Sequence, residues 1–337
     1  MSSNARLAVG IVGCGYQGNL FAQSLADSDQ WKIVACADPD GEAASRLARS
    51  FGEVAPFSSV TQMLELAELD AVVVAPSHDA LCESALAAIH AGKHVLLEKP
   101  LGLNETQAAR LEAALEGSPV CLMAGYSFRY IAAWQKVHEL LRAGAVGKPH
   151  TLMGAIGVGP MTSGWKANRE TGGGPLLYVG SHLVDQMLWY AEDEPVEVSA
   201  EIRMAANSGV DETTTFQLKF RGGAVAQGMV TQTAHAGLNS HLGIYGPKGR
   251  IALRGAGFNY GVEVASSALD GLLQPTTFQI PQTEDLRLLM HQPQLAEFAE
   301  AIREGRQPSC TLAEGRRVLK VLDAIRSSAE SARPVKV

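Results

Sequence analysis

The stretch "LAVGIVGCGYQG", residues 7–18, decides how the rest of the chain is interpreted. It begins with a continuous apolar run, which is typical of a strand covered on both faces, and ends in the spacing Gly13-x-Gly15-x-x-Gly18. Between a strand and a helix, the first glycine permits a tight turn and the second lets a pyrophosphate approach the backbone. The third lets the helix pack closely on the strand. The stretch therefore predicts a dinucleotide-binding turn.

An acidic residue after the second strand completes this fingerprint. Asp38 ends the apolar run "WKIVACAD" (31–38), 20 residues beyond Gly18. A carboxylate there binds the ribose diol and repels a 2′-phosphate, so we expect NAD in preference to NADP. Arg46 is near enough along the chain to moderate this preference. Tyr16 and Gln17, inside the turn, are also expected to contact the cofactor.

Strand-like and helix-like segments alternate over the first 125 residues. Apolar runs at 71–76, 94–100 and 120–126 continue the series, with helical periodicity between them. The alternation predicts an α/β dinucleotide-binding domain with a doubly wound parallel sheet over residues 1–125. Ligands bind where the strands of such a sheet end, which adds Pro76, Ser77, His78, Glu98, Lys99, Tyr126 and Arg129 to the candidates. A solvated ion pair is the alternative for Glu98 and Lys99.

The pattern changes after residue 126. Short strand-like segments at 196–203, 213–220, 224–232, 241–246 and 250–255 have few helices between them, and residues 211–231 predict a hairpin that turns at "RGG". We therefore expect residues 126–337 to form a second, α+β domain with a mainly antiparallel sheet. Leu295, Phe298 and Ile302 have helical spacing, which predicts a helix near the end of the chain.

Polar residues mark the expected starts of several helices. Ser59 with Gln62, and Thr311 with Glu314, have the spacing of a capping box. Asp79 and Asn104 are expected to cap the helices that follow them.

Composition narrows the class of protein. The 337 residues are 46% hydrophobic and 19% charged, which favours two domains with packed cores. The net charge of −7 and the lack of a basic run argue against nucleic acid as a partner. No apolar run approaches the ~20 residues that span a bilayer. Five scattered cysteines suit a cytoplasmic location, and the histidine spacing predicts no metal.

A second stretch, "GGGPLLYVGSHLVDQ" (172–186), carries candidate catalytic residues. Tyr178 and His182 lie four residues apart, on one face of an α-helix. Because an unperturbed imidazole has a pKa near ~6.5, a histidine such as His182 suits a general base at neutral pH. The phenol of Tyr178 would donate to a substrate oxygen or orient the imidazole. A packed core pair is the alternative. Asp185 would supply charge to the site, or cap or pair on the flank of the helix.

Several segments together resemble the glucose-fructose oxidoreductase, inositol dehydrogenase and MocA-type (Gfo/Idh/MocA) oxidoreductases. The residues that carry the resemblance are "GIVGCGYQG" (10–18), "AGKHVLLEKPL" (91–101), "GYSFRY" (125–130), residues 172–186 and "QLAEFAEAIREGRQP" (294–308). The resemblance implies a Rossmann domain, then a domain with a large open antiparallel sheet whose face forms homodimers or homotetramers. It also implies hydride transfer between NAD(P) and a secondary alcohol or ketone of a sugar, cyclitol or sugar derivative.

The resemblance assigns roles to matched positions. It places Lys99 near the nicotinamide and the reacting hydroxyl, where its charge would stabilise a developing alkoxide, and Glu98 near the nicotinamide ribose. It implies a cis bond before Pro100 and a catalytic role for His182. Trp165 would flank the nicotinamide or substrate, and Tyr126 and Arg129 would border the pocket. The chain departs from the pattern at Tyr178, where relatives usually have aspartate.

Two other functions are compatible with these residues. A glycoside-cleaving enzyme would keep NAD bound and use it for transient oxidation of its substrate. A non-catalytic regulatory protein would bind NAD without transferring a hydride.

Overall fold

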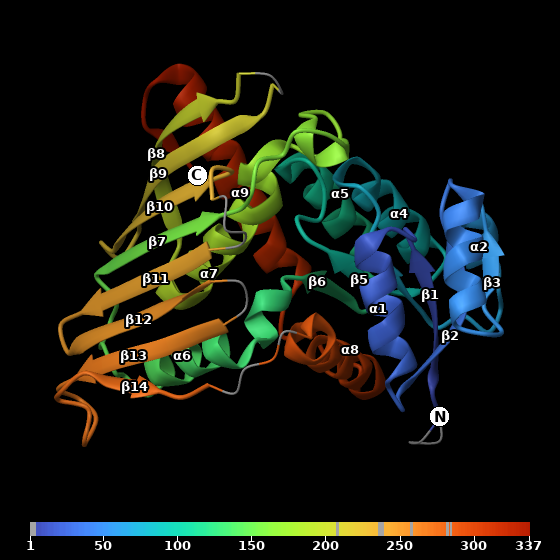
Figure 1. The fold of residues 1–337 in the computed structure, drawn as a ribbon, viewed down its shortest axis with the longest axis horizontal. Helices are drawn as coiled ribbons and strands as arrows, with labels where there is room; N and C mark the ends of the chain where they lie inside the picture. Colours follow the sequence, from blue (N-terminus) through green and yellow to red (C-terminus); the bar gives the residue numbers. More distant parts are fainter. Residues whose placement is uncertain (1–4, 207–208, 235–238, 257–258, 281–282, 284) are drawn as a thin grey trace. The chain divides into compact units, whose positions relative to one another are not determined.

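The computed structural model describes residues 5–337 apart from 207–208, 235–238, 257–258, 281–282 and 284. The chain forms two compact units, which Figure 1 shows in sequence colours. The first consists of residues 1–127 and 285–317, and the second of residues 128–284 and 318–337. The chain therefore returns to its first unit before it ends in the second.

The first unit is built on a six-stranded parallel sheet (Figure 1). Its strands are β1 (Leu7–Val12), β2 (Trp31–Ala37), β3 (Ala55–Phe57), β4 (Ala71–Val74), β5 (His94–Glu98) and β6 (Leu122–Gly125). Their order, β3-β2-β1-β4-β5-β6, is that of a doubly wound dinucleotide-binding sheet. All four side chains of β4 are buried, as expected where helices cover both faces. The predicted parallel sheet is confirmed, and the short β3 was not predicted.

Polar residues stand near the starts of several helices between these strands, but not all of them form the predicted caps. They are α1 (Tyr16–Ala26), α2 (Gly41–Ser50), α3 (Val60–Leu64), α4 (His78–His90) and α5 (Glu105–Leu115). Asn104 caps α5 by accepting the Gln107 N–H at 3.1 Å. Ser59 precedes α3, yet its side chain caps none of the helix's described N–H groups. Asp79 lies in the first turn of α4, after the N-cap residue Ser77, so these two predictions were wrong.

A returning segment completes the first unit. It contains the π-helical turn η4 (Arg287–His291), helix α8 (Gln292–Glu304) and the start of α9 (Leu312–Ser331). The Trp31 indole N–H donates to the Leu295 carbonyl at 3.1 Å, and its ring stacks on Phe298 with 5.6 Å between centroids. The predicted capping box of α9 is confirmed: the N–H groups of Thr311 and Glu314 donate to each other's side chains at 2.8 and 3.3 Å.

The second unit is built on a nine-stranded sheet. Its strands are β7 (Thr151–Gly157), β8 (Pro195–Met204), β9 (Asp211–Phe220), β10 (Val225–Thr231), β11 (Asn239–Gly246), β12 (Gly249–Ala256), β13 (Asn259–Ser266), β14 (Thr276–Phe278) and β15 (Val335–Lys336). The order is β14-β13-β12-β11-β7-β10-β9-β8-β15, antiparallel except between β7 and β10. The predicted hairpin is confirmed as β9 and β10.

Helices α6 (Ala132–Arg142) and α7 (Ser181–Ala191) contact the sheet of the second unit (Figure 1). A side-chain carbon at Gly154 would lie 2.7 Å from Leu183, so α7 rests directly on the backbone of β7. Side chains of the opposite face are partly exposed, among them Met153 at 47% and Met229 at 39%. No described helix in either unit is long and apolar enough to cross a membrane.

Candidate functional site

In the glycine turn between β1 and α1, two glycines pack against the protein backbone and the third faces open space. Gly13 has a φ of +88°, and a side-chain carbon there would lie 2.7 Å from the backbone of Ala75. At Gly18 such a carbon would lie 1.8 Å from the Gly13 carbonyl oxygen, whereas at Gly15 it would meet nothing within 4 Å. No described side chain caps α1, so its first N–H groups can receive an anion.

Asp38 lies beside this turn and is held by two backbone hydrogen bonds. One carboxylate oxygen accepts the Cys14 N–H at 2.7 Å, and the other accepts the Asp40 N–H at 2.8 Å. Arg46 lies 3.7 Å from the Asp40 carboxylate. A hydrogen bond with Cys36, with burial, raises the pKa of the Cys14 thiol, so this residue brings no negative charge to the turn. The cradle therefore fits a dinucleotide with its pyrophosphate at Gly15 and a ribose at Asp38.

The other candidates of the first unit follow the ends of neighbouring strands. Pro76, Ser77 and His78 come after β4, and His78 is buried in the first turn of α4. Glu98 is the last residue of β5, and its buried carboxylate accepts the Gln17 amide N–H at 3.0 Å. Lys99 comes next, and the Lys99–Pro100 bond is cis, as the resemblance implied. Tyr126 follows β6 and is fully buried. Because the strands are parallel, these positions share one sheet edge with Gly13 and Asp38.

In the second unit, a folded loop brings Trp165 and Tyr178 toward a common neighbour, Lys166. The loop contains η2 (Trp165–Ala167), and a side-chain carbon at Gly172 would lie 2.3 Å from the Trp165 carbonyl oxygen. The Lys166 ammonium donates to the Tyr178 hydroxyl at 2.9 Å, 4.1 Å from the centre of that ring and 5.5 Å from that of Trp165.

Lys166 was missed by the sequence reasoning, and its only signal was its place beside Trp165. The hydrogen bond from Lys166 restricts what the Tyr178 hydroxyl can do. An ammonium can only donate, so the Tyr178 oxygen accepts from Lys166 and its own hydrogen is directed elsewhere. This arrangement suits a phenol that donates to a further group.

Tyr178 and His182 lie on either side of a change in helix type. Tyr178 belongs to a π-helical turn, η3 (Leu176–Gly180), whereas His182 is in the first turn of α7. The continuous α-helix expected from the sequence was therefore wrong for this turn, and π-helical turns are frequent at functional sites. His182 is buried and stacks on Phe128, with ring centroids 4.0 Å apart.

Asp185 and Arg129 form a buried ion pair one turn beyond His182. Arg129 lies in the 3₁₀ turn η1 (Ser127–Tyr130), and its Nε and Nη2 donate to the Asp185 carboxylate at 3.0 and 2.7 Å. Both side chains are at least 95% buried. Of the roles expected for Asp185, the structure shows pairing.

A further carboxylate holds the start of η3. One Asp211 oxygen accepts the Leu176 N–H at 2.9 Å and the Thr214 hydroxyl at 3.2 Å. Burial raises the pKa of Asp211. Arg326 donates to the Gly173 carbonyl at 3.2 Å, so β9 and α9 both anchor the loop that precedes Tyr178. Among the described residues of the two units, no three His, Cys, Asp or Glu side chains lie close enough together to hold a metal ion.

Comparisons with known proteins match two successive parts of the chain, which meet near the first boundary between the units. A model of an oxidoreductase family with an NAD-binding Rossmann fold matches residues 7–126, and a model of the GFO/IDH/MocA C-terminal domain matches residues 134–252. The chain is 25% identical to myo-inositol 2-dehydrogenase of Thermotoga maritima, over 98% of both chains. It is 30% identical to 1,5-anhydro-D-fructose reductase of Ensifer adhaerens, over 63% of this chain and 69% of that one.

A solved structure of GenD2 from gentamicin A biosynthesis, in complex with NAD, is similar over the whole chain. It has a TM-score of 0.87 and 27% identity, and the match covers 100% of this chain and 98% of that one.

Two substitutions in the glycine turn should have different effects, one on cofactor binding and the other on the stability of the protein. Gly15→Ala should fold normally, because the added carbon meets no protein atom, but should weaken NADH binding by at least ~10-fold by obstructing the pyrophosphate. Gly18→Ala should instead destabilise the protein, because its carbon overlaps the Gly13 oxygen. Thermal unfolding and NADH titration of both variants test this. Full NADH affinity in Gly15→Ala would contradict the placement of the pyrophosphate.

Proposed function

The chain belongs to the Gfo/Idh/MocA family of NAD-binding oxidoreductases, and we propose that it interconverts a secondary alcohol and a ketone in a sugar, cyclitol or sugar derivative. One observation carries the proposal: Lys99, directly after the last residue of β5, shares a sheet edge with the glycine turn and Asp38. The relatives named above act, by their names, on a cyclitol and an anhydro-sugar, which supports the substrate class. NAD is the cofactor, and Asp38 favours it over NADP.

In this proposal the first unit binds the cofactor and the second binds the substrate. Residues 1–125 hold the dinucleotide through Gly13, Gly15, Tyr16, Gln17, Gly18, Asp38, Pro76, Ser77, His78, Glu98 and Lys99. Residues 128–284 and 318–337 hold the substrate and the subunit interface. Arg129 and Trp165 complete the cofactor site, and Tyr126, Trp165, Tyr178, His182, Asp185 and Lys99 contact the substrate.

The catalytic roles follow from the chemistry of three side chains. Bound NAD supplies the hydride acceptor, or NADH the donor. His182 takes the hydroxyl proton as the alcohol is oxidised and returns it in reduction. Lys99 stabilises the negative charge that develops on the substrate oxygen. Tyr178, whose oxygen accepts from Lys166, donates its hydrogen to a substrate oxygen in place of the charge that an aspartate would bring.

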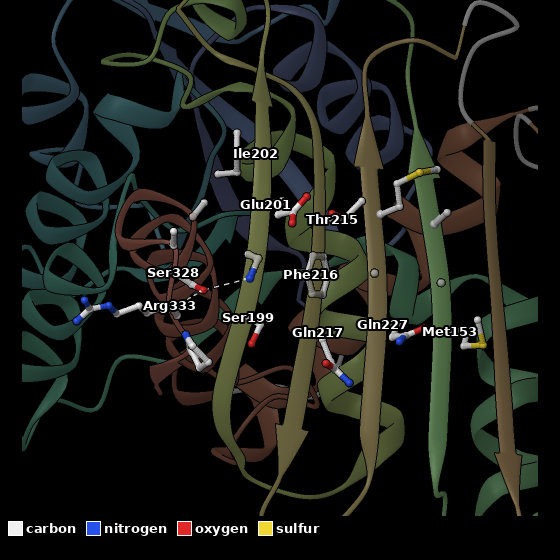
Figure 2. A pocket seen from close by; sticks show the side chains of 18 of the residues that line it. Met153, Ser199, Glu201, Ile202, Thr215, Phe216, Gln217, Gln227, Ser328 and Arg333 are labelled. Carbon is white, nitrogen blue, oxygen red and sulfur yellow. Dashed lines mark hydrogen bonds between the residues drawn. The ribbon is translucent and has the colours of Figure 1, made fainter.

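The exposed sheet face of the second unit supports a homo-oligomer. A hollow of about 1010 Å³ runs along β8, β9, β10 and β7. Figure 2 shows Met153, Ser199, Gln217 and Gln227 among the side chains that line it. Among the described residues that line the hollow, Glu201 and Arg333 are the only acidic, lysine or arginine side chains, which suits a buried contact between copies. We expect a dimer or tetramer through this face. Sedimentation as a monomer at micromolar concentration would contradict it.

The cysteines support a cytoplasmic location. All five are free thiols, four buried and Cys121 half-buried, as in a reducing compartment. Recovery of the protein outside the cytoplasm of its host would contradict this assignment.

Lys99→Ala should lower turnover by at least ~10²-fold, because the variant loses the charge that stabilises the alkoxide. The assay is hydride transfer across polyols, aldoses and their keto forms, with Lys32→Ala, an exposed lysine of β2, as the matched control. Undiminished turnover of a true substrate would reject the role. Glycoside cleavage without accumulation of NADH, or tight NADH binding with no transfer to any substrate, would replace the proposal by one of the two alternative functions.

Tyr178→Phe should lower kcat about 10- to 100-fold, the usual loss when a hydrogen bond to a charged group is removed. Lys166→Met should show a smaller loss, and Lys166→Arg should restore most of it because arginine also donates. Steady-state kinetics on one substrate measures all three variants. An equal loss in Lys166→Arg and Lys166→Met would show that donation to Tyr178 is not what Lys166 contributes.

A further inference from the structure

A buried histidine far along the chain contacts the glycine turn of the first unit. His291 ends the π-helical turn η4, is fully buried and stacks on Phe21 of α1, with ring centroids 4.4 Å apart. Its Nε2 lies 3.0 Å from the Gln17 amide nitrogen, and the same nitrogen lies 3.0 Å from a carboxylate oxygen of Glu98. Gln17 therefore connects the returning segment to the end of β5.

The chemistry of the three groups fixes where the hydrogens lie. A carboxylate only accepts, so Gln17 must present its NH₂ rather than its carbonyl oxygen to Glu98. The second amide hydrogen then points to His291 Nε2, which must accept it, and the imidazole carries its own proton on Nδ1. Burial lowers the pKa of His291 to about 4, so the ring is neutral at pH 7 and able to accept.

Stability alone does not explain a histidine here. Its Nδ1 is buried and has no hydrogen-bond partner in the described part of the chain, which costs stability. A phenylalanine would retain the stacking on Phe21 without that unpaired nitrogen. What histidine adds over phenylalanine is the acceptor that faces Gln17.

We propose that His291 is a positioning residue of the cofactor site, which accepts one amide hydrogen of Gln17 and so directs the other to Glu98. The proposal rests on the proposed place of Glu98 beside the nicotinamide ribose. It makes the returning segment, which is remote in sequence from the Rossmann motifs, part of the machinery that orients the cofactor.

A double-mutant cycle on NADH binding tests the proposal. His291→Phe and Gln17→Leu should each raise the NADH dissociation constant about 3- to 10-fold, the usual effect of one lost hydrogen bond. If His291 acts only through Gln17, the double variant should bind no more weakly than Gln17→Leu alone. Additive losses, or wild-type affinity in His291→Phe, would overturn the proposal.

Phe298→Leu is the matched control, because it loosens the same segment without touching Gln17. It should lower the thermal midpoint and leave the NADH dissociation constant unchanged. The opposite pattern is expected for His291→Phe, with a near-normal midpoint and weaker binding. Parallel losses in both variants would show a merely structural role.

The cofactor-free protein offers a second readout. Selective ¹⁵N labelling of histidine, with His291→Phe to assign the resonance, should show an imidazole that is protonated on Nδ1 at pH 7. A proton on Nε2 would overturn the proposal. Neither measurement needs a substrate, so a failure to find hydride transfer would leave this test intact.

Discussion

The close approach of Gly18 to the carbonyl oxygen of Gly13 is the constraint on which the cofactor site depends. With 1.8 Å between that oxygen and any added side-chain carbon, only glycine lets α1 begin against the end of β1. That contact sets the direction of α1, whose first N–H groups are left for an anion. It also leaves the Cys14 N–H where Asp38 can accept it. One close contact thus fixes both the phosphate end and the ribose end of the site.

The second unit uses backbone contact in a similar way. Gly172 lies against the Trp165 carbonyl, and a carbon at Gly174 would lie 2.4 Å from an Asp211 oxygen. Side chains from two 3₁₀ turns then supply positive charge: Lys166 of η2 at Tyr178, and Arg129 of η1 at Asp185. A buried ion pair adds little net stability, because the desolvation of its charges offsets their attraction. The value of the Arg129–Asp185 pair is to fix η1 against the helix that carries His182.

Predictions from short sequence patterns succeeded where the residues of the pattern make the contact among themselves. Asn104 caps α5 and Thr311 pairs with Glu314 because in each case a side-chain oxygen accepts the N–H of the residue three positions on. Ser59 has the same spacing to Gln62, but α3 has only five residues and its side chain makes no cap. The failure at Tyr178 is of another kind. No sequence period distinguishes a single π-helical turn from an α-helical one, and here Asp211, 35 residues on from Leu176, holds its first N–H.

The sequence by itself determined the parallel sheet, the glycine turn, the acidic residue at Asp38 and the change to a mainly antiparallel unit, because each depends on the spacing of neighbouring residues. Only the tertiary structure decided which unit residues 285–317 join, which groups accompany Gln17 and Tyr178, and which partner Asp185 has. Those contacts join residues up to 274 positions apart. They depend on how packed elements meet in space, which the periodicity of a single segment does not encode.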